Sequence, residues 1–174
     1  MKIFVTGNQQ FGRPNAIKKY KRPFNTVDEM NLALVDAWNS VVSDNDIVYV
    51  LGNFAWDPET AEIALKELNG TIVAIGGEYD KSISELVTIS SISNDITYFD
   101  NSIDVQHDAK MVFSYWPLSE WQGKSKGYYS VIGYPDKKYK TNHKNKVINS
   151  SYDFWEYKPI NVSEVVSLFN EVSS

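Results

Sequence analysis

The chain has 174 residues, of which 43% are hydrophobic and 22% charged, which predicts a single domain over residues 1–174 with a sizeable core. It contains no cysteine, which excludes disulfides and thiolate metal sites. The formal net charge of −5 argues against a general nucleic-acid binder, because phosphate contacts need clustered lysine and arginine.

Strand and helix signals alternate in the first half of the chain. Ile3–Val5 and Ile47–Leu51 are short apolar runs of the kind that form buried strands. Between them, Thr26 and Glu29 make a capping box, which predicts the start of a helix. Apolar residues recur along this helix every three or four positions, at Met30, Leu34, Trp38 and Val41. Such a stripe predicts that the helix packs on the sheet.

A second helix and a third strand follow. Asp57 is the expected N-cap, with Pro58 in the first helical position. Asn69-Gly70 mark the expected end of this helix, whose apolar residues are Ile63, Leu65 and Leu68. Thr71–Ile75 then form the next strand.

This βαβαβ order predicts a parallel sheet with right-handed crossovers, and therefore an α/β fold. Ligand sites of such sheets lie at the carboxyl ends of the strands. We therefore expect a site where three loops meet, after Thr6, Leu51 and Ile75.

The second half of the chain is richer in strand signals. We expect further strands at Ile96–Phe99, Ile103–Val105, Met111–Ser114, Tyr128–Ile132 and Lys146–Asn149. Asn161 and Glu164 cap a last helix with the apolar residues Val165, Val166, Leu168 and Phe169. The serine- and isoleucine-rich stretch Lys81–Asn94 is the expected place of a variable insertion, with or without a short helix.

A basic segment stands out in this acidic chain. It contains Asn142, His143 and five lysines, Lys137, Lys138, Lys140, Lys144 and Lys146. Our main interpretation is a solvated loop, and the alternative is a patch for an acidic partner. No basic leader precedes an apolar core, and no apolar run approaches the roughly 20 residues that span a bilayer. We therefore expect a cytoplasmic protein without membrane contact.

Three segments, Arg22–Met30, Trp38–Val42 and Asp46–Gly52, carry a resemblance to a known family. The tail Asn149–Pro159 agrees with them. In order along the chain, these segments resemble the short calcineurin-like metallophosphoesterases that are frequent in bacteriophage and bacterial genomes. The resemblance implies a layered sheet sandwich flanked by helices, in which two metal ions clamp a phosphate and supply a hydroxide nucleophile.

The motif positions of that family carry other residues here. Its Asp-x-His motif reads Asn8-Gln9-Gln10, its Gly-Asn-His-Asp motif reads Gly77-Glu78-Tyr79-Asp80, and its Gly-His-x-His motif reads Gly133-Tyr134-Pro135-Asp136. The resemblance places the former metal and catalytic positions at Asn8, Gln10, Asn53, Glu78, Tyr79, Tyr115, Tyr134 and Asp136.

These substitutions predict the loss of the metal centre. Asparagine in place of aspartate removes the negative charge that offsets the repulsion between two dications. Tyrosine, with an ordinary pKa of about 10, is protonated at neutral pH and does not replace a neutral imidazole. The two histidines, His107 and His143, lie outside the motifs. We therefore expect no catalytic residue, no metal ion and no cofactor.

The acidic residues near these motifs leave two interpretations open. In one, Glu78, Asp80 and Asp136 converge on a single hard cation such as Mg²⁺ or Ca²⁺. In the other, Asp80 binds backbone amides at the end of its strand, while Glu78 and Asp136 are solvated.

Aromatic residues are frequent around the same motifs. We expect Tyr79, Tyr115, Trp116, Trp121 and Tyr134 to form an interaction surface, which Phe11 and Trp56 extend. Tyrosine and tryptophan are enriched at protein-binding hot spots because they bury a large area and keep a polar group. The alternative is that these rings fill the volume that the metals and imidazoles would occupy.

Our leading hypothesis is a catalytically inactive pseudo-phosphoesterase that binds a protein. The phage-type resemblance suggests a phage-encoded inhibitor of a host defence or nucleic-acid enzyme, acting in the host cytoplasm. The alternative is a residual metal-dependent phosphodiesterase, or a phosphate- or nucleotide-binding protein that uses Arg13, Arg22, Lys81 and Lys137. Self-association as a homo-oligomer is left open.

Overall fold

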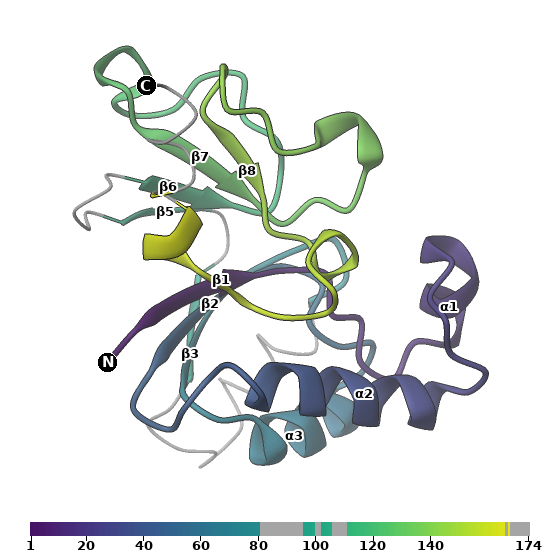
Figure 1. Cartoon of the computed structure of the whole chain (residues 1–174). Coiled ribbons are helices and arrows are strands. Elements are labelled where there is room, and N and C mark those ends of the chain that lie inside the picture. Colours follow the sequence, from purple (N-terminus) through teal and green to yellow (C-terminus); the bar gives the residue numbers. More distant parts are fainter. Residues whose placement is uncertain (81–95, 100–101, 106–110, 166, 168–174) are drawn as a thin grey trace.

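The computed structural model describes residues 1–80, 96–99, 102–105, 111–165 and 167 (Figure 1). Helices α2 (Val27–Asn39) and α3 (Pro58–Glu67) cover one face of a first sheet, and a second sheet lies against its other face. The fold class is therefore α/β with two sheets. The expected insertion at Lys81–Asn94 lies outside the described residues.

The first sheet has the strand order β4-β3-β2-β1-β9. Its first four strands in the chain run parallel to one another: β1 (Ile3–Thr6), β2 (Ile47–Leu51), β3 (Thr71–Ile75) and β4 (Ile96–Phe99). The predicted parallel βαβαβ arrangement is confirmed. Strand β9 (Ile160–Asn161) pairs antiparallel with β1 and was not expected, because two residues carry no periodic signal.

Helix α2 begins as its capping box predicts. The Thr26 side chain accepts the Glu29 N–H at 3.1 Å, and the Glu29 carboxylate accepts the Asn25 N–H at 2.8 Å. The apolar stripe is buried against the first sheet through Met30, Leu34 and Trp38.

Helix α3 is capped by Asp57, which accepts the Thr60 N–H at 2.8 Å. The helix ends at Glu67, two positions before the expected Asn69-Gly70 stop. Its buried residues are Ala61 and Ala64, and Leu68, which follows the helix as its C-cap, is buried as well. Ile63 points away from the sheet and is 58% exposed, so it does not belong to the core stripe.

The second sheet has the order β5-β6-β7-β8. Its strands are β5 (Ser102–Val105), β6 (Met111–Ser114), β7 (Tyr129–Ile132) and β8 (Val147–Asn149). Only β5 and β6 run antiparallel, and the other neighbours are parallel. The predicted strands are confirmed with ends shifted by at most one residue.

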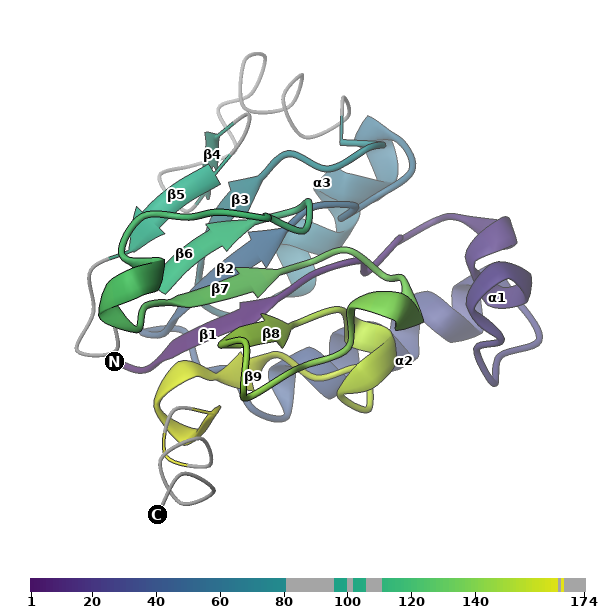
Figure 2. The same cartoon turned by 90° about the horizontal axis from the view of Figure 1, so that it is seen from above.

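The two sheets share a core that aligns their strand ends. Leu51 and Ile75 of the first sheet belong to one buried cluster with Phe113 and Val131 of the second. A Cβ at Gly133 would lie 1.7 Å from the Leu51 carbonyl oxygen, so only glycine allows this approach. Figure 2 shows β7 crossing over the first sheet in this region. The loops after β2 and β7 therefore open at one edge of the molecule.

Four short helical segments complete the fold. They are α1 (Pro14–Tyr20) and the 3-10 turns η1 (Lys124–Lys126), η2 (Lys137–Tyr139) and η3 (Tyr152–Phe154). None was predicted, because each is too short for a helical apolar period. Asn161 accepts the Ser163 N–H at 3.0 Å and so caps the helical residues 162–165 as expected, while Val166, Leu168 and Phe169 lie outside the described residues. No helix in the described part of the chain has the length and apolar character to cross a membrane.

Candidate functional site

The loops after β1, β2 and β3 meet, as the strand order predicts. The Asn8 N–H donates to the Gly52 carbonyl at 2.8 Å, and the Tyr79 N–H donates to the Asn53 side-chain oxygen at 3.2 Å. Asn8, Gln10 and Asn53 have left-handed backbones, with φ of 62°, 61° and 57°. This conformation costs a non-glycine residue about 1 kcal/mol, and asparagine tolerates it best. The backbone turns here are held by the contacts between the loops.

Four of the positions that the resemblance marks as metal or catalytic positions form a buried network of neutral side chains. Asn8 Oδ1 accepts from Gln10 Nε2 at 2.7 Å and from Asn53 Nδ2 at 3.4 Å. Asn53 Nδ2 also donates to the Tyr115 hydroxyl at 2.7 Å. All four side chains are buried. We call Asn8, Gln10, Asn53 and Tyr115 the amide–phenol network, and its members carry no charge and are hydrogen-bonded to one another.

A buried ion pair is hydrogen-bonded to this network. Arg22 Nε lies 2.8 Å from Asp153 Oδ1, with side-chain exposures of 0% and 12%. The Arg22 guanidinium also donates to the carbonyls of Gln9 at 2.6 Å and Asn8 at 2.7 Å. Asp153 in turn accepts from Asn8 Nδ2 at 2.8 Å. The pair therefore ties the tail of the chain to the loop after β1.

Arg13 lies on the other side of the network. Its guanidinium donates to Gln10 Oε1 at 2.6 Å and lies 4.0 Å from the Tyr79 ring centroid and 4.7 Å from that of Trp56. Such cation–π contacts hold the two rings in place. Trp56 is nevertheless 50% exposed. We call Arg13, Trp56 and Tyr79 the arginine stack.

Asp80 binds the backbone and not a cation. Its carboxylate accepts the N–H groups of Asn53, of Phe54 at 2.8 Å and of Gly77 at 2.7 Å. Burial raises the pKa of Asp80 to about 6, and the three hydrogen bonds oppose that rise. Glu78 and Asp136 are exposed. The hypothesis that these three acids share one cation is therefore wrong, because both Asp80 oxygens face amides.

The side chains of the network do not fit a two-metal centre. Such a centre needs anionic carboxylates and neutral imidazoles. Asn8, Gln10 and Asn53 offer neutral amides, and burial raises the pKa of the Tyr115 hydroxyl above its ordinary value. In the part of the chain that the structure describes, no group of three or more histidine, cysteine, aspartate or glutamate side chains is placed to hold a metal ion.

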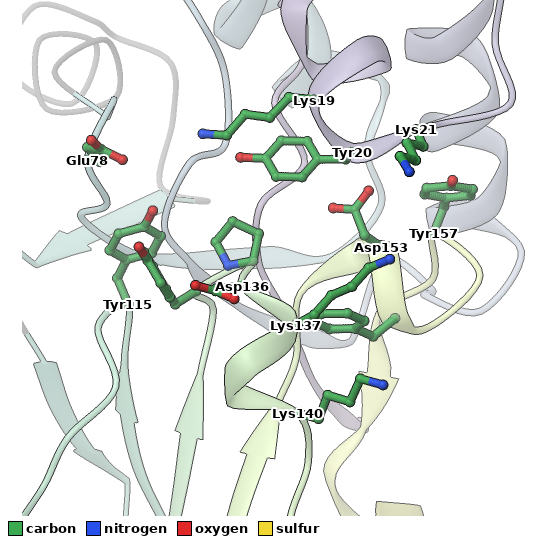
Figure 3. Close-up of a pocket in the computed structure, with 13 residues that line it drawn as sticks. Lys19, Tyr20, Lys21, Glu78, Tyr115, Asp136, Lys137, Lys140, Asp153 and Tyr157 are labelled. Carbon is green, nitrogen blue, oxygen red and sulfur yellow. The ribbon is translucent and has the colours of Figure 1, made fainter.

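A pocket of about 830 Å³ opens beside the network (Figure 3). Of the predicted site residues, Glu78, Tyr115, Tyr134 and Asp136 line it. The remaining walls come from Lys19, Tyr20, Lys21, Pro135, Lys137, Lys140, Asp153, Phe154 and Tyr157. Sequence reasoning missed Lys19 and Lys21 as site residues. Their signal was the basic run Lys18-Lys19-Tyr20-Lys21, but its position opposite the β7–β8 loop depends on the tertiary fold.

The predicted aromatic surface is divided by the fold. Trp116 is 51% exposed and packs on Tyr134, with 5.1 Å between ring centroids, and Tyr134 packs on Tyr139 at 5.8 Å. We call these three residues the aromatic rim. Tyr115 is only 1% exposed, so in contrast to our expectation it adds almost no area to a protein-binding surface. Trp121 lines a separate hollow with Lys144 and Lys146.

Two further sequence-based expectations are corrected here. Phe11 is buried and packs on Phe54, with 5.2 Å between ring centroids, so it does not extend the surface. Arg13 and Arg22 are buried and bound to Gln10 and Asp153, so they are not available as a phosphate clamp. Lys81 lies outside the described residues. Of that expected phosphate-binding set, the pocket keeps Lys137.

Comparison with known proteins identifies a relative. The chain is 31% identical over 176 residues to the uncharacterized protein MJ1445 of Methanocaldococcus jannaschii, covering 98% of this chain and 92% of that protein. The chain belongs to the family of this archaeal protein. A crystal structure of AQ665, a protein of unknown function from Aquifex aeolicus, superposes with a TM-score of 0.73 over 96% of this chain and 98% of that one.

The Aquifex protein is 16% identical to this member of the MJ1445 family, and at that level the likeness shows a shared fold alone. No family model matches the chain. Neither protein's name states an activity, so the resemblance to metallophosphoesterases stays a prediction.

Proposed function

We propose that this protein is a non-catalytic relative of the calcineurin-like metallophosphoesterases, with their layered sheet sandwich, and that it binds a partner protein at the edge where the family holds its metals. The observation that carries this proposal is the amide–phenol network, which fills the former metal positions with neutral, mutually bonded side chains.

The network favours a structural role for these four residues. A cation placed there would have to break the hydrogen bonds among Asn8, Gln10 and Asn53 before it gained an oxygen ligand. Amide oxygens carry no net charge, so they offer little to offset the desolvation of a dication. Arg13 and Arg22 add two positive charges next to the network, and only Asp153 pairs with one of them there. Electrostatics at this position therefore disfavour metal binding.

The exposed aromatic groups favour protein recognition. Trp116 of the aromatic rim and Trp56 of the arginine stack are each about half exposed. Both rings are already held by neighbours, Trp116 by Tyr134 and Trp56 by Arg13. A rigid, exposed tryptophan loses little side-chain entropy on binding and buries a large apolar area. A surface that binds a protein without catalysing a reaction can block that protein or recruit it. We therefore propose inhibition or recruitment as the mode of action.

The proposal is tested by affinity capture from lysate of the native cellular setting, read by mass spectrometry. We expect a protein in stoichiometric amounts with the wild type and its loss with a Trp116→Ala, Tyr134→Ala variant. A Leu32→Ala, Ile63→Ala variant is the matched control, because it removes two exposed apolar side chains from the helical layer. Capture that is equal in all three proteins, or absent throughout, would overturn the assignment of this face.

A further inference from the structure

The pocket beside the network carries an unusual number of lysines for an acidic chain. Lys19 and Lys21 come from the end of α1, and Lys137 and Lys140 come from η2 and the residue after it. These two segments are far apart in the sequence and face each other across the pocket (Figure 3). None of the three ion pairs among the described residues includes any of these four lysines. Among the described residues, no carboxylate forms an ion pair with these lysines, so they present positive charge to a ligand.

The acidic residues of the pocket do not cancel this charge. Asp153 is neutralised by its two hydrogen bonds with Arg22, at 2.8 Å and 3.0 Å. Asp136 accepts the Lys138 N–H at 2.8 Å as the cap of η2, which holds its carboxylate near the backbone. Glu78 and Asp136 then remain against four lysines. A net positive pocket attracts an anionic ligand.

Two features of the pocket favour carboxylates along a chain over a compact phosphate. Arg13 and Arg22, whose forked guanidiniums are the best phosphate ligands, are buried and bound to Gln10 and Asp153. The lysine amines are also spread around the pocket and do not gather at one point (Figure 3). A phosphate concentrates its charge at one point, whereas glutamate or aspartate side chains on a peptide are spaced several ångströms apart.

Aromatic groups adjoin the lysines. Tyr20 and Tyr157 form part of the wall, and Tyr134 belongs both to the pocket and to the aromatic rim. A ligand seated on the lysines therefore lies next to Tyr134, and Trp116 packs on the Tyr134 ring just outside the pocket. We propose that the pocket binds an acidic peptide segment of the partner protein, with an aromatic or large apolar side chain of that segment packed on Trp116 and Tyr134. This inference rests on the proposed function and adds the chemistry of the partner.

The test uses fluorescence anisotropy with a fluorescein-labelled peptide of alternating glutamate and tyrosine. We expect saturable binding that weakens as NaCl is raised, because exposed charges are screened over about 8 to 10 Å at physiological salt. A Lys19→Glu, Lys137→Glu variant should bind at least tenfold more weakly. Lys126→Glu, Lys144→Glu is the matched control, since it makes the same charge change at exposed lysines that do not line this pocket, and it should change affinity less than twofold.

Three outcomes would overturn the inference. They are no saturable binding of the peptide, an equal loss in the two lysine variants, and displacement of the peptide by micromolar ADP or pyrophosphate. The last outcome would make the pocket a phosphate site.

The proposed function is judged separately. Capture of a partner that depends on Trp116 and Tyr134 but is unchanged in Lys19→Glu, Lys137→Glu is one such result. That result would support the proposed function and contradict the inference that the partner binds through an acidic segment. Peptide binding that depends on the lysines but not on Trp116 and Tyr134 would support the anion-binding pocket and contradict a role of the aromatic rim.

Discussion

The guanidinium of Arg22 donates two hydrogen bonds, of 2.8 Å and 3.0 Å, to the carboxylate of Asp153, which lies 131 positions further along the chain. The same guanidinium holds the carbonyls of Asn8 and Gln9. One buried cation thus fixes both the loop after β1 and the tail that returns beneath it. These hydrogen bonds couple the positions of the two segments.

Removing Arg22 should therefore be strongly destabilising. Arg22→Met leaves the Asp153 carboxylate unpaired in a mostly buried position, and we expect a loss of about 3–5 kcal/mol in the free energy of unfolding. Arg22→Met, Asp153→Leu removes both charges and should lose less than the single variant. Urea unfolding of the three proteins measures this difference. A double variant that is less stable than Arg22→Met would contradict the account.

Asp80 gives a pH dependence with a defined sign. Burial raises its folded pKa to about 6, above the ordinary value of 3.8, so the folded protein binds the proton more tightly than the unfolded chain. The contribution of Asp80 to stability is therefore fully present below about pH 4 and is lost as the pH rises through about 6, by an amount on the order of 3 kcal/mol.

The variant Asp80→Asn measures the contribution of the Asp80 carboxyl to stability. Its amide can accept fewer of the three backbone N–H groups, so we expect the variant to be less stable by about 1–3 kcal/mol for each donor left unpaired. The stability advantage of the wild type over Asp80→Asn should shrink between pH 4 and pH 7. Thermal melts of both proteins across that pH range measure this difference. A difference in stability that grows with pH would contradict a raised pKa of Asp80.

Restoring an acid at Asn53 tests the neutral character of the network. Asn53→Asp places a carboxylate near the Asn8 Oδ1 atom, which lies 3.4 Å from the present amide nitrogen. Two oxygen acceptors would then face each other in a buried site, and we expect a loss of about 1–3 kcal/mol. Asn31→Asp, in helix α2, is the comparison, because the Asn31 side-chain oxygen accepts the Gly12 N–H at 3.0 Å and a carboxylate would still accept it. Denaturant midpoints that shift equally for the two variants would show no special cost within the network.

A substitution at Tyr152, unlike those above, is expected not to reduce stability. Its ring is fully buried, and its hydroxyl has no hydrogen-bond partner among the described residues. Burial also raises the pKa of this hydroxyl well above its ordinary value. Because an unpaired buried hydroxyl costs about 1–3 kcal/mol, Tyr152→Phe should leave stability unchanged or increase it. A clear decrease in melting temperature would mean that the hydroxyl has a partner.

The sequence predicted those parts of the fold that depend on local signals. The capping residues Thr26 and Asp57 begin their helices, and the apolar runs of β1, β2 and β3 form the parallel sheet. The outward position of Ile63 was not predictable in the same way. Periodicity identifies a helix, but the face that meets the sheet depends on which side chains fit there, and in α3 these are alanines.

The sequence predicted which loops come together, but not which side chains are exposed there. Asn8, Gln10, Asn53 and Tyr115 do come together, because strand order and motif spacing fix where they lie. The burial of Tyr115, the separation of Trp121 and the entry of Lys19 into the pocket depend on how the second sheet and α1 pack. Those contacts join residues distant in the sequence, and no local pattern encodes them.

The central claim is that the positions which the resemblance assigns to metals do not form a two-metal centre in this protein. Calorimetric titration with Mn²⁺, with hydrolysis of bis(p-nitrophenyl) phosphate followed in the same samples, tests it most directly. We expect no saturable binding and no hydrolysis above the rate in Mn²⁺ buffer. Binding of about two ions per chain, with hydrolysis that Asn8→Ala and Asp136→Ala each abolish while the protein stays folded, would contradict the claim.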